Sequence, residues 1–414
     1  MQEADVLVIG AGAGGIVAAW RAASLGAKTV LLEKTPRIGT KILISGGGKC
    51  NITHDGPIET VLRAFRPEEA RFIRPACYRF PNHRIVEMLT DRGLNVYTRP
   101  DGRIFPVEQT AKDVVAILRT YLDDAGVDLR LETPVESIVS DDRGVSGVRT
   151  KHGPMACRHV ILATGGSSYP NSGTTGDGWP WARSLGHSLA PIRAALAPIF
   201  LPGQEARSGI ALRDIVLKAR QSGKVIDRHR GDLLFTHRGI SGPATLEVSR
   251  AVSEHLEQGP VTLEVDLQPD QSFEELSAEV KAWLAEHPKR QIRGLAEAYV
   301  AKSLAGDLLA DAEIPPETVA AQLPQKARNR LIEVLKGWSL GSVEGVWLDK
   351  GEVVAGGVCL DEVDPQTMRS RLCRGLYLCG EVLDLAGPVG GYNLQAAFAT
   401  GFVAGETAAG DATS

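Results

Sequence analysis

The segment from Gly39 to His54, GTKILISGGGKCNITH, concentrates residues that could contact and react with a bound molecule. It holds four glycines and two lysines beside Cys50 and Asn51. Glycine lets the main chain approach a flat ring without a Cβ atom in the way, and the N–H groups can then donate hydrogen bonds. The alternative is a flexible surface loop, and the elements on either side decide between the two.

The elements before this segment form the pattern of a nucleotide-binding βαβ unit. We expect a strand at residues 5–9, the motif G-x-G-x-x-G at 10–15, a helix at 16–25 and a second strand at 28–33. The glycines serve a tight turn, close approach to a pyrophosphate and close packing of the helix. Glu33 ends the second strand, where it can accept hydrogen bonds from an unphosphorylated ribose. The residues that this unit assigns to a dinucleotide are Gly10, Gly12, Ala13, Gly14, Gly15, Glu33 and Lys34.

The glycine-rich segment favours FAD over NAD as that dinucleotide. A nicotinamide dehydrogenase would continue with further β-α units, whereas here the second strand runs directly into the glycine-rich loop. Strands at 158–166 and 375–384 fit the same ligand, and a helix at 390–405 would direct its N-terminal N–H groups at the flavin. The alternative is a packing helix, in which Gly401 and Gly405 permit close contact. The further residues assigned to FAD are Lys41, Ser45, Gly46, Gly47, Gly48, Cys50, Asn51, Val135, Ala163, Thr164, Gly165, Gly380, Glu381, Gly391, Tyr392 and Asn393.

The middle of the chain interrupts this pattern with short β-like runs and then helices. Ser272 and Glu275 form a capping box that predicts the start of one helix, and residues 342–358 are expected to form a hairpin. The predicted fold class is α/β. Its expected parts are a discontinuous Rossmann-like FAD-binding domain at residues 1–190 and 355–414, a β-rich substrate domain at 191–270 and 337–354, and a helical insertion at 271–336.

Six stretches that lie between residues 5 and 408 resemble the BaiN/RdsA family of FAD-dependent oxidoreductases. They are VIGAGAGG, GTKILISGGGKCNITH, GRIFPVEQTAKDVV, ILATGGSSYPNSGTTGDGWPWARSLGH, GDLLFTHRGISGPATLEVS and AGGVCLDEVDPQTMRSRLCRGLYLCGEVLDLAGPVGGYNLQAAFATG. The resemblance implies a glutathione-reductase-type FAD fold with a β-domain and a helical insertion. It also implies one of three activities, which are reduction of a conjugated C=C bond in steroid-like acids, reduction of uridine in ribosomal RNA, and oxidation of a small amine. Lys49 and Val389 depart from the residues that many relatives carry at these positions.

Reduction of an activated alkene needs a hydride from the flavin and a proton from an acid or from water. Cys50 is a candidate acid because of its place in the glycine-rich loop, with an inert buried thiol as the alternative. Tyr392, His237 and His54 are further candidates, although a lone histidine is usually structural. Two polar residues could hydrogen-bond flavin or substrate, or simply cap turns: Asn51 and Ser241.

The electron donor and the partner are indicated only indirectly. A second complete G-x-G-x-x-G with its own βαβ unit does not occur, so NAD(P)H is expected to visit the flavin transiently. The stretch from Arg183 to Arg238 holds ten Lys and Arg residues against four Asp and Glu, in a chain of net charge −4. This excess could follow the phosphate backbone of ribosomal RNA, wall a pocket for an anionic small molecule, or form a solvated basic face.

Composition narrows the class of protein. The 414 residues are 43% hydrophobic and 23% charged, which is typical of a soluble globular protein with two or three domains. The six cysteines form no C-x-x-C pair, so neither a metal site nor a disulfide framework is expected. We expect no membrane segment and a cytoplasmic location, because no run is apolar and long enough to span a bilayer and no signal peptide is evident. The oligomeric state is left open.

These patterns predict an FAD-dependent oxidoreductase that uses NAD(P)H to reduce a conjugated C=C bond. Uridine in ribosomal RNA is the leading substrate, and a small carboxylated enone such as a steroid-like acid is the second. Two other functions compete with this prediction. One is an oxidase of a small amine that forms hydrogen peroxide, and the other is a non-catalytic flavin-containing binding factor.

Overall fold

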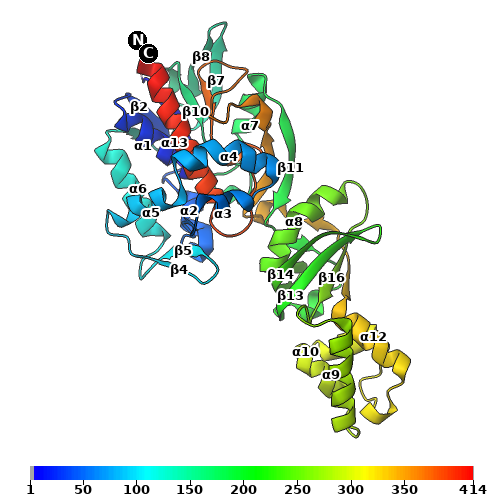
Figure 1. Cartoon of the computed structure of the whole chain (residues 1–414). Helices are drawn as coiled ribbons and strands as arrows, with labels where there is room; N and C mark the ends of the chain where they lie inside the picture. The colour runs from blue at the N-terminus through cyan, green and yellow to red at the C-terminus, as the bar shows by residue number, and fades with distance from the viewer. Residues whose placement is uncertain (1–3, 414) are drawn as a thin grey trace. The chain divides into compact units, whose positions relative to one another are not determined.

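The computed structural model describes residues 4–413 (Figure 1). The chain divides into two compact units, and both ends of the chain contribute to the first. Unit 1 runs to Ile192 and resumes at Val353, and unit 2 is Arg193–Glu352. Unit 2 therefore holds both the β-rich and the helical stretch, and their separation into two parts stays a prediction.

The centre of unit 1 is a five-stranded parallel sheet in the order β20-β10-β1-β2-β6. Its strands are β1 (Val6–Ile9), β2 (Thr29–Leu32), β6 (Asp128–Arg130), β10 (Val160–Leu162) and β20 (Leu376–Leu378). The strands β1, β2, β10 and β20 are buried throughout, as their apolar sequences require in a parallel sheet with covered faces. Helix α1 (Ala13–Ser24) connects β1 to β2. The predicted α/β class with a Rossmann-like sheet is confirmed.

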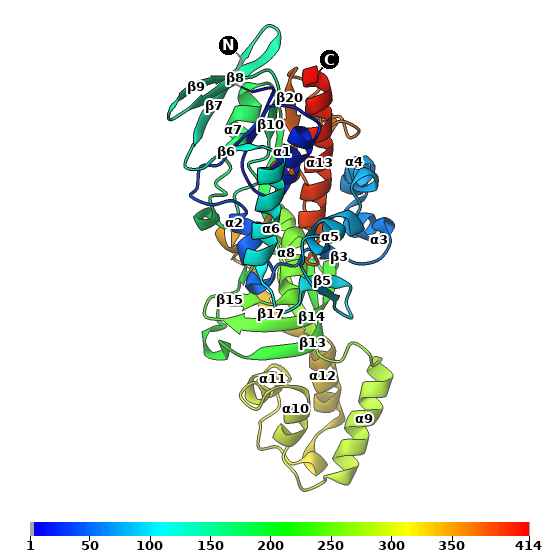
Figure 2. The same ribbon diagram turned by 90° about the vertical axis from the view of Figure 1, so that its left-hand side faces the viewer.

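The C-terminal helix α13 (Tyr392–Thr413) packs directly on α1 (Figure 2). A Cβ atom at Gly401 would lie 2.2 Å from the carbonyl oxygen of Gly14, and one at Gly405 would lie 2.2 Å from that of Ala18. The two backbones therefore touch, and glycine is the residue that permits this distance. The contact joins the last helix of the chain to the first.

The rest of unit 1 surrounds the parallel sheet. A sheet of β3 (Thr53–His54), β5 (Arg103–Pro106) and β4 (Val96–Thr98) is antiparallel, as is one of β7 (Val135–Asp141), β8 (Gly144–Thr150) and β9 (Gly153–Ala156). The further helices are α2 (Thr40–Ile44), α3 (Ile58–Arg63), α4 (Pro67–Arg79), α5 (Asn82–Thr90), α6 (Ala111–Asp124) and α7 (Gly178–Ser184). Short 3-10 turns lie at Ser45–Gly48, Pro170–Ser172, Leu360–Glu362 and Gly380–Val382.

Unit 2 contains a seven-stranded antiparallel sheet in the order β17-β16-β13-β14-β15-β12-β18. The strands are β12 (Ile199–Phe200), β13 (Ala211–Gln221), β14 (Lys224–Thr236), β15 (Gly239–Ser241), β16 (Thr262–Asp266), β17 (Trp338–Ser342) and β18 (Gly345–Val346). The helices are α8 (Pro243–Leu256), α9 (Phe273–Glu286), α10 (Arg293–Tyr299), α11 (Ala305–Asp311) and α12 (Gln325–Lys336), with 3-10 turns at Glu205–Arg207, Ala320–Gln322 and Leu348–Lys350.

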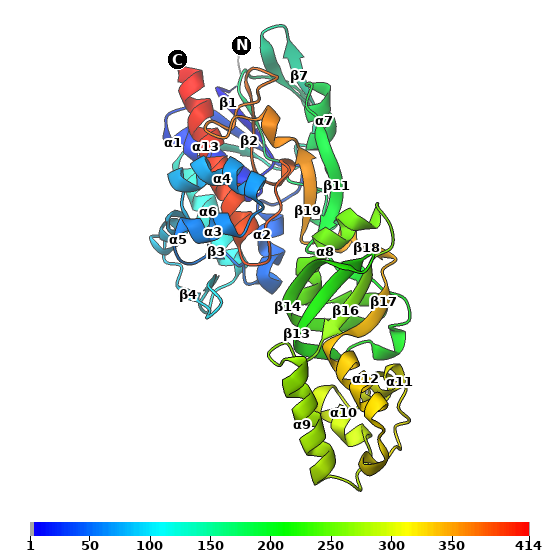
Figure 3. The same cartoon turned by 45° about the vertical axis from the view of Figure 1, so that its right-hand side comes forward.

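The helices α9 to α12 are inserted between β16 and β17 and lie together beside the sheet (Figure 3). They share one apolar core with it, in which Trp338 and Phe235 are fully buried. Helix α9 begins at the predicted capping box, where Ser272 Oγ accepts from the Glu275 N–H at 3.2 Å and the Glu275 carboxylate accepts from the Ser272 N–H at 2.8 Å.

The predicted hairpin at residues 342–358 is wrong. Strand β18 pairs with β12, and β19 (Val353–Val358) pairs with β11 (Leu189–Ala195). The two strands therefore pair with strands about 150 residues or more earlier in the sequence instead of with each other. Their alternation and spacing in the sequence resemble those of a hairpin. Local sequence does not specify the partner of a short strand, so it could not show that each strand pairs elsewhere.

Replacement of Gly401 by alanine tests the contact between α1 and α13. Alanine has the higher helix propensity, but its Cβ atom would overlap the Gly14 carbonyl. We expect G401A to lower the free energy of unfolding by about 1–3 kcal/mol in urea titrations. Gly410 is the matched control, because a Cβ atom there would meet no atom within 4 Å. G410A should raise the stability by roughly 0.5–1 kcal/mol, and equal effects of the two changes would rule out the backbone contact.

Candidate active site

A cavity lies at the carboxyl ends of β1 and β2 in unit 1, where open α/β sheets bind their ligands. Of the residues that the sequence assigned to a dinucleotide, Gly10, Glu33, Lys34, Val135 and Thr164 line it. The cavity also contains residues that the sequence reasoning missed: Ile9, Leu32, Thr133, Gly173, Thr175, Asp177 and Trp181. Four of these seven come from the stretch ILATGGSSYPNSGTTGDGWPWARSLGH, which carried the family resemblance and was the signal that could have found them.

Glu33 ties the end of β2 to the loop after β1. Its carboxylate accepts hydrogen bonds from the backbone N–H groups of Ala11 and Thr35, both at 2.8 Å. Each carboxylate oxygen has a further lone pair, so the group can also accept from a ribose hydroxyl in the cavity. Glu33 would therefore serve both the local backbone and the predicted ligand.

The glycines of the G-x-G-x-x-G motif have two different roles: some allow close packing, and one leaves space for a ligand. A Cβ atom at Gly15 would lie 1.8 Å from the Gly10 carbonyl oxygen, and one at Gly10 would lie 2.7 Å from that of Ala163. Both glycines therefore let α1 and the strands approach closely. A Cβ atom at Gly12 would meet no atom within 4 Å, so the N-terminus of α1 faces open space of the kind a pyrophosphate would fill.

Lys34 is held by two polar side chains of the cavity. Its ammonium group donates to Thr175 Oγ1 and to the Asp177 carboxylate, both at 2.5 Å. Burial opposes ionisation of Asp177, but hydrogen bonds from Lys34 and Thr175 outweigh it, and the pKa of this carboxyl is lowered. Asp177 is therefore ionised at neutral pH and neutralises Lys34.

A second ion pair joins the N-terminal and C-terminal segments of unit 1. The Lys41 ammonium group lies 2.6 Å from the Glu381 carboxylate and donates to Ser168 Oγ at 2.8 Å. Glu381 also accepts from the Val354 N–H at 3.0 Å. A Cβ atom at Gly166 would lie 3.2 Å from the Glu381 carboxyl carbon, so the glycines after β10 leave room for this side chain.

The glycine-rich loop is partly helical, since α2 occupies Thr40–Ile44 within the segment predicted to be a loop. Gly46 and Gly47 have left-handed backbones, with φ of 56° and 68°. A Cβ atom at Gly46 would lie 2.8 Å from the Phe105 ring, whereas one at Gly47 would meet no atom within 4 Å. Ser45 closes the loop by accepting a hydrogen bond from the Cys50 N–H at 3.0 Å.

Cys50 is fully buried, and its burial raises the pKa of the thiol to about 12. Its backbone is left-handed, with φ of 63°. The side chain is therefore a neutral thiol at physiological pH and cannot act as a nucleophilic thiolate. As an acid it is weak, because general acids work best with a pKa near the operating pH.

Two buried polar atoms next to this loop have no hydrogen-bond partner among the described residues. They are Asn51 Oδ1, on a residue that is 8% exposed, and His54 Nδ1. The His54 ring stacks on Tyr392 with centroids 4.8 Å apart and ring planes 23° apart. Unpartnered buried polar atoms are rare in folded proteins, and they fit a site whose ligand supplies the missing partner.

The N-terminus of α13 lies against the strand β3 that carries His54. Thr53 Oγ1 donates to Gln395 Oε1 at 2.9 Å, and a Cβ atom at Gly391 would lie 2.7 Å from the Thr53 backbone. Asn393 uses its side chain to hold the preceding loop, through hydrogen bonds of 2.8 and 2.9 Å with the backbone of Gly387. The first N–H groups of a helix have no acceptor within the helix, so those of α13 can serve a ligand here.

Two candidates lie in the other unit. His237 is exposed in the turn between β14 and β15, and Ser241 ends β15. They are therefore not among the residues that unit 1 brings together. Within residues 4–413 the structure contains no cluster of three or more histidine, cysteine or acidic side chains that could hold a metal ion. No helix in that range is both long and apolar enough to cross a membrane.

Comparisons with known proteins agree with this architecture. The family described as HI0933-like protein Rossmann domain matches residues 4–407. The chain belongs to this family. Ribosomal RNA dihydrouridine synthase of Haemophilus influenzae is 30% identical over 404 residues, which are 97% of each chain. The 3-dehydro-bile acid delta(4,6)-reductase of Clostridium scindens is 31% identical over 406 residues, 97% of this chain and 98% of the relative.

The solved structures show the fold. The chain is similar to 3-ketosteroid delta1-dehydrogenase from Sterolibacterium denitrificans, with a TM-score of 0.57, 17% identity and 99% of each chain covered. The family membership and the full-length relatives make the protein an FAD-dependent oxidoreductase, as predicted. FAD fits unit 1, because the cavity beside Glu33, the open space at Gly12 and the unpartnered Asn51 Oδ1 suit its separate parts.

Replacement of Glu33 by glutamine tests the adenosine end of the site. The amide cannot accept from both the Ala11 and the Thr35 N–H, and it has no charge to strengthen a bond from ribose. We expect the Kd for FAD, measured by quenching of flavin fluorescence, to rise about tenfold to a hundredfold. The exposed Glu132 provides a matched change, and E132Q should bind FAD like the native protein. Equal affinity of E33Q and E132Q would remove Glu33 from the cofactor site.

The reactivity of Cys50 tests its protonation state. Because its pKa is about 12, the thiolate fraction at pH 8 is near 10⁻⁴, against tens of per cent for an ordinary cysteine. Alkylation by iodoacetamide, followed on the Cys50 peptide by mass spectrometry, should be slower than in the denatured protein by at least ~10³-fold. The rate should also keep rising above pH 9. Rapid labelling with a plateau near pH 8.5 would contradict a buried neutral thiol.

Proposed function

We propose that this protein is an NAD(P)H-driven reductase of a C=C bond conjugated to a carbonyl group, and that its leading substrate is uridine in ribosomal RNA. The observation that carries the proposal is the unpartnered pair Asn51 Oδ1 and His54 Nδ1 beside the N-terminus of α13. This grouping offers an acceptor, a proton donor and backbone N–H groups within one part of unit 1. Reduction of a conjugated C=C bond needs these functions.

FAD, when bound, supplies the hydride. His54 is the proposed proton donor, because imidazole is the commonest general acid and its Nδ1 has no protein partner among the described residues. Tyr392 fixes the orientation of the imidazole by stacking on it. The N–H groups of α13 would hold a carbonyl oxygen or the flavin at a positively polarised helix end. Cys50 remains a candidate acid, but a weaker one, because its proton is held with a pKa of about 12.

The names of the relatives support the reaction class and indicate two candidate substrates. Two proteins named ribosomal RNA dihydrouridine synthase, from Haemophilus influenzae and Escherichia coli, are 30% and 29% identical along 97% of this chain. The relative named 3-dehydro-bile acid delta(4,6)-reductase is 31% identical over the same share. Uracil and a steroid enone share one chemical feature, a C=C bond conjugated to a carbonyl. A small carboxylated enone is therefore the second candidate.

The electron donor is proposed from the chain's own dinucleotide site. The glycine motif at β1 is used by FAD in this proposal, so NAD(P)H would bind without a Rossmann motif of its own and leave after reducing the flavin. Rapid mixing of the oxidised holoenzyme with NADH and with NADPH tests this step directly. Bleaching of the flavin by either nucleotide supports the donor, and reduction by a small amine with formation of peroxide supports an oxidase instead.

Anaerobic stopped-flow reoxidation tests the function. Photoreduced holoenzyme is mixed with ribosomal RNA that lacks the modification, with a carboxylated enone and with buffer alone. We expect the RNA to reoxidise the flavin, and H54Q to lower that rate constant by roughly 10²–10⁴-fold because the proton donor is lost. His83, exposed on α5, provides the control variant H83Q, which should react like the native enzyme.

Each outcome of this experiment has a defined meaning. Reoxidation by the enone alone would replace RNA as the substrate. Reoxidation by neither compound would leave the amine oxidase and the non-catalytic binding factor, and reduction of the flavin by a small amine separates these two. Normal reoxidation in H54Q would keep the reaction class but remove His54 as the proton donor.

A further inference from the structure

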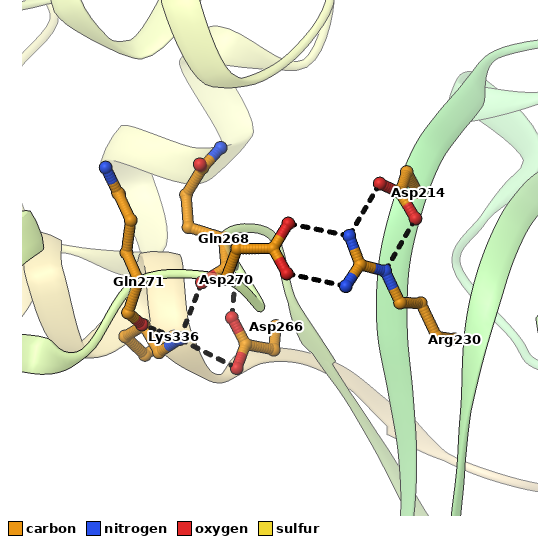
Figure 4. Close-up of polar contacts among 7 residues, drawn as sticks. All are labelled: Asp214, Arg230, Asp266, Gln268, Asp270, Gln271 and Lys336. Carbon is orange, nitrogen blue, oxygen red and sulfur yellow. Dashed lines mark hydrogen bonds and ion pairs between the residues drawn. The ribbon is translucent and has the colours of Figure 1, made fainter.

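The basic stretch at residues 183–238 carries less available charge than its sequence suggests. Six of its ten basic side chains form ion pairs with carboxylates inside unit 2, and these six are Arg193, Arg207, Arg213, Lys218, Arg220 and Arg230. Figure 4 shows Arg230 held from both sides, 2.7 Å from Asp214 and 2.6 Å from Asp270. A phosphate would have to compete with these carboxylates, so these six side chains are less available to RNA than the count along the sequence indicates.

Arg238 differs from these six side chains. It is exposed in the turn between β14 and β15, and among residues 4–413 it has no carboxylate partner. Its guanidinium carbon lies 4.8 Å from the ring centroid of Phe200 and 4.8 Å from that of Trp347. The two rings lie 4.1 Å apart at an angle of 53°. Aromatic faces thus hold the guanidinium in place while its N–H donors remain available.

The backbone fixes the two rings at the edge of the sheet. Phe200 lies in β12, directly between Gly239 of β15 and Gly345 of β18. Both cross-strand neighbours lack a side chain, so neither covers the Phe200 ring, and a Cβ atom at Gly345 would only touch it, at 3.7 Å. Trp347 follows β18 and is anchored by a hydrogen bond from its backbone N–H to the Pro198 carbonyl at 3.0 Å.

We propose that Phe200, Arg238 and Trp347, here called the Arg238 platform, bind one unpaired nucleotide of the RNA substrate. Bases of single-stranded RNA stack on aromatic rings and on guanidinium planes, and an arginine without an acidic partner can also donate to a phosphate or a base edge. The platform offers both kinds of surface in one place. This inference rests on the proposed function, since it gives the RNA substrate a binding surface in unit 2.

The test is binding of a fluorescein-labelled oligouridylate to the FAD-loaded full-length protein, followed by anisotropy at constant salt. R238A should raise the Kd about tenfold or more, as expected when one stacked base loses its support. R238K keeps the charge but not the plane, so it should also bind more weakly than the native protein. R213A is the matched control, because Arg213 is exposed on the adjacent strand and already paired with Asp232. It should change the Kd less than about twofold.

A second measurement separates this proposal from the proposed function. Reoxidation of the photoreduced enzyme by free uridine and by a carboxylated enone depends on unit 1 and should be the same in R238A and in the native protein. This also shows that R238A is folded. If native protein binds and is reoxidised by RNA while R238A and R213A behave alike, the platform is wrong and the function stands. If native protein neither binds nor is reoxidised by RNA, the RNA function itself fails.

Discussion

The contact between α1 and α13 is the constraint on which the rest of unit 1 depends. Gly401 and Gly405 place the backbone of α13 against Gly14 and Ala18 of α1, so the two helices are fixed along and around their axes. Because α1 begins at the glycine motif, this register also fixes where α13 begins. The N-terminus of α13 then lies against β3, which carries Thr53 and His54 into the same place.

Two kinds of contact hold the candidate site together. Within the first third of the chain, Glu33 joins β2 to the loop after β1 by backbone hydrogen bonds. Between the ends of the chain, the link is the ion pair of Lys41 and Glu381, whose side chains are 27% and 16% exposed. The net stabilisation by a partly buried ion pair is small, because burial costs each charge part of its hydration. Removal of one partner destabilises the protein by more than this, since the other charge is left unpaired. The pair therefore links the two segments, and loss of either side chain would leave the other charge partly buried without its partner.

The sequence predicts local structure well in this chain because each signal lies within a few residues. The βαβ unit at residues 5–33, the helix from Tyr392 and the capping box at Ser272 are of this kind. The partners of short strands are not local, which is why β18 and β19 were mistaken for a hairpin. The cavity residues Thr133 and Asp177 were missed for the same reason, since they reach Glu33 and Lys34 only through the fold.

The net charge of a surface depends on residues that are distant in the sequence, even more than strand pairing does. The excess at residues 183–238 is real in the sequence, but strand pairing sets β13 beside β16, and the acidic side chains of β16 then neutralise Lys218 and Arg220. A count of charged residues within one segment cannot include the acidic residues of another strand that pairs with it in the fold. Within the described residues Arg238 has no such ion pair, because the groups beside its side chain are glycines and the aromatic rings of Phe200 and Trp347 instead of carboxylates.

Unpartnered polar atoms carry more information about the site than charge does. Folded proteins satisfy nearly all buried polar groups, so each exception indicates where a partner is missing. In unit 1, Thr164 Oγ1 is such an atom at the cavity beside Glu33, and Asn51 Oδ1 and His54 Nδ1 are two more beside the N-terminus of α13. FAD is an extended molecule with polar groups at both ends, so in the proposed function its nucleotide would offer a partner to Thr164 and its ring to Asn51 and His54.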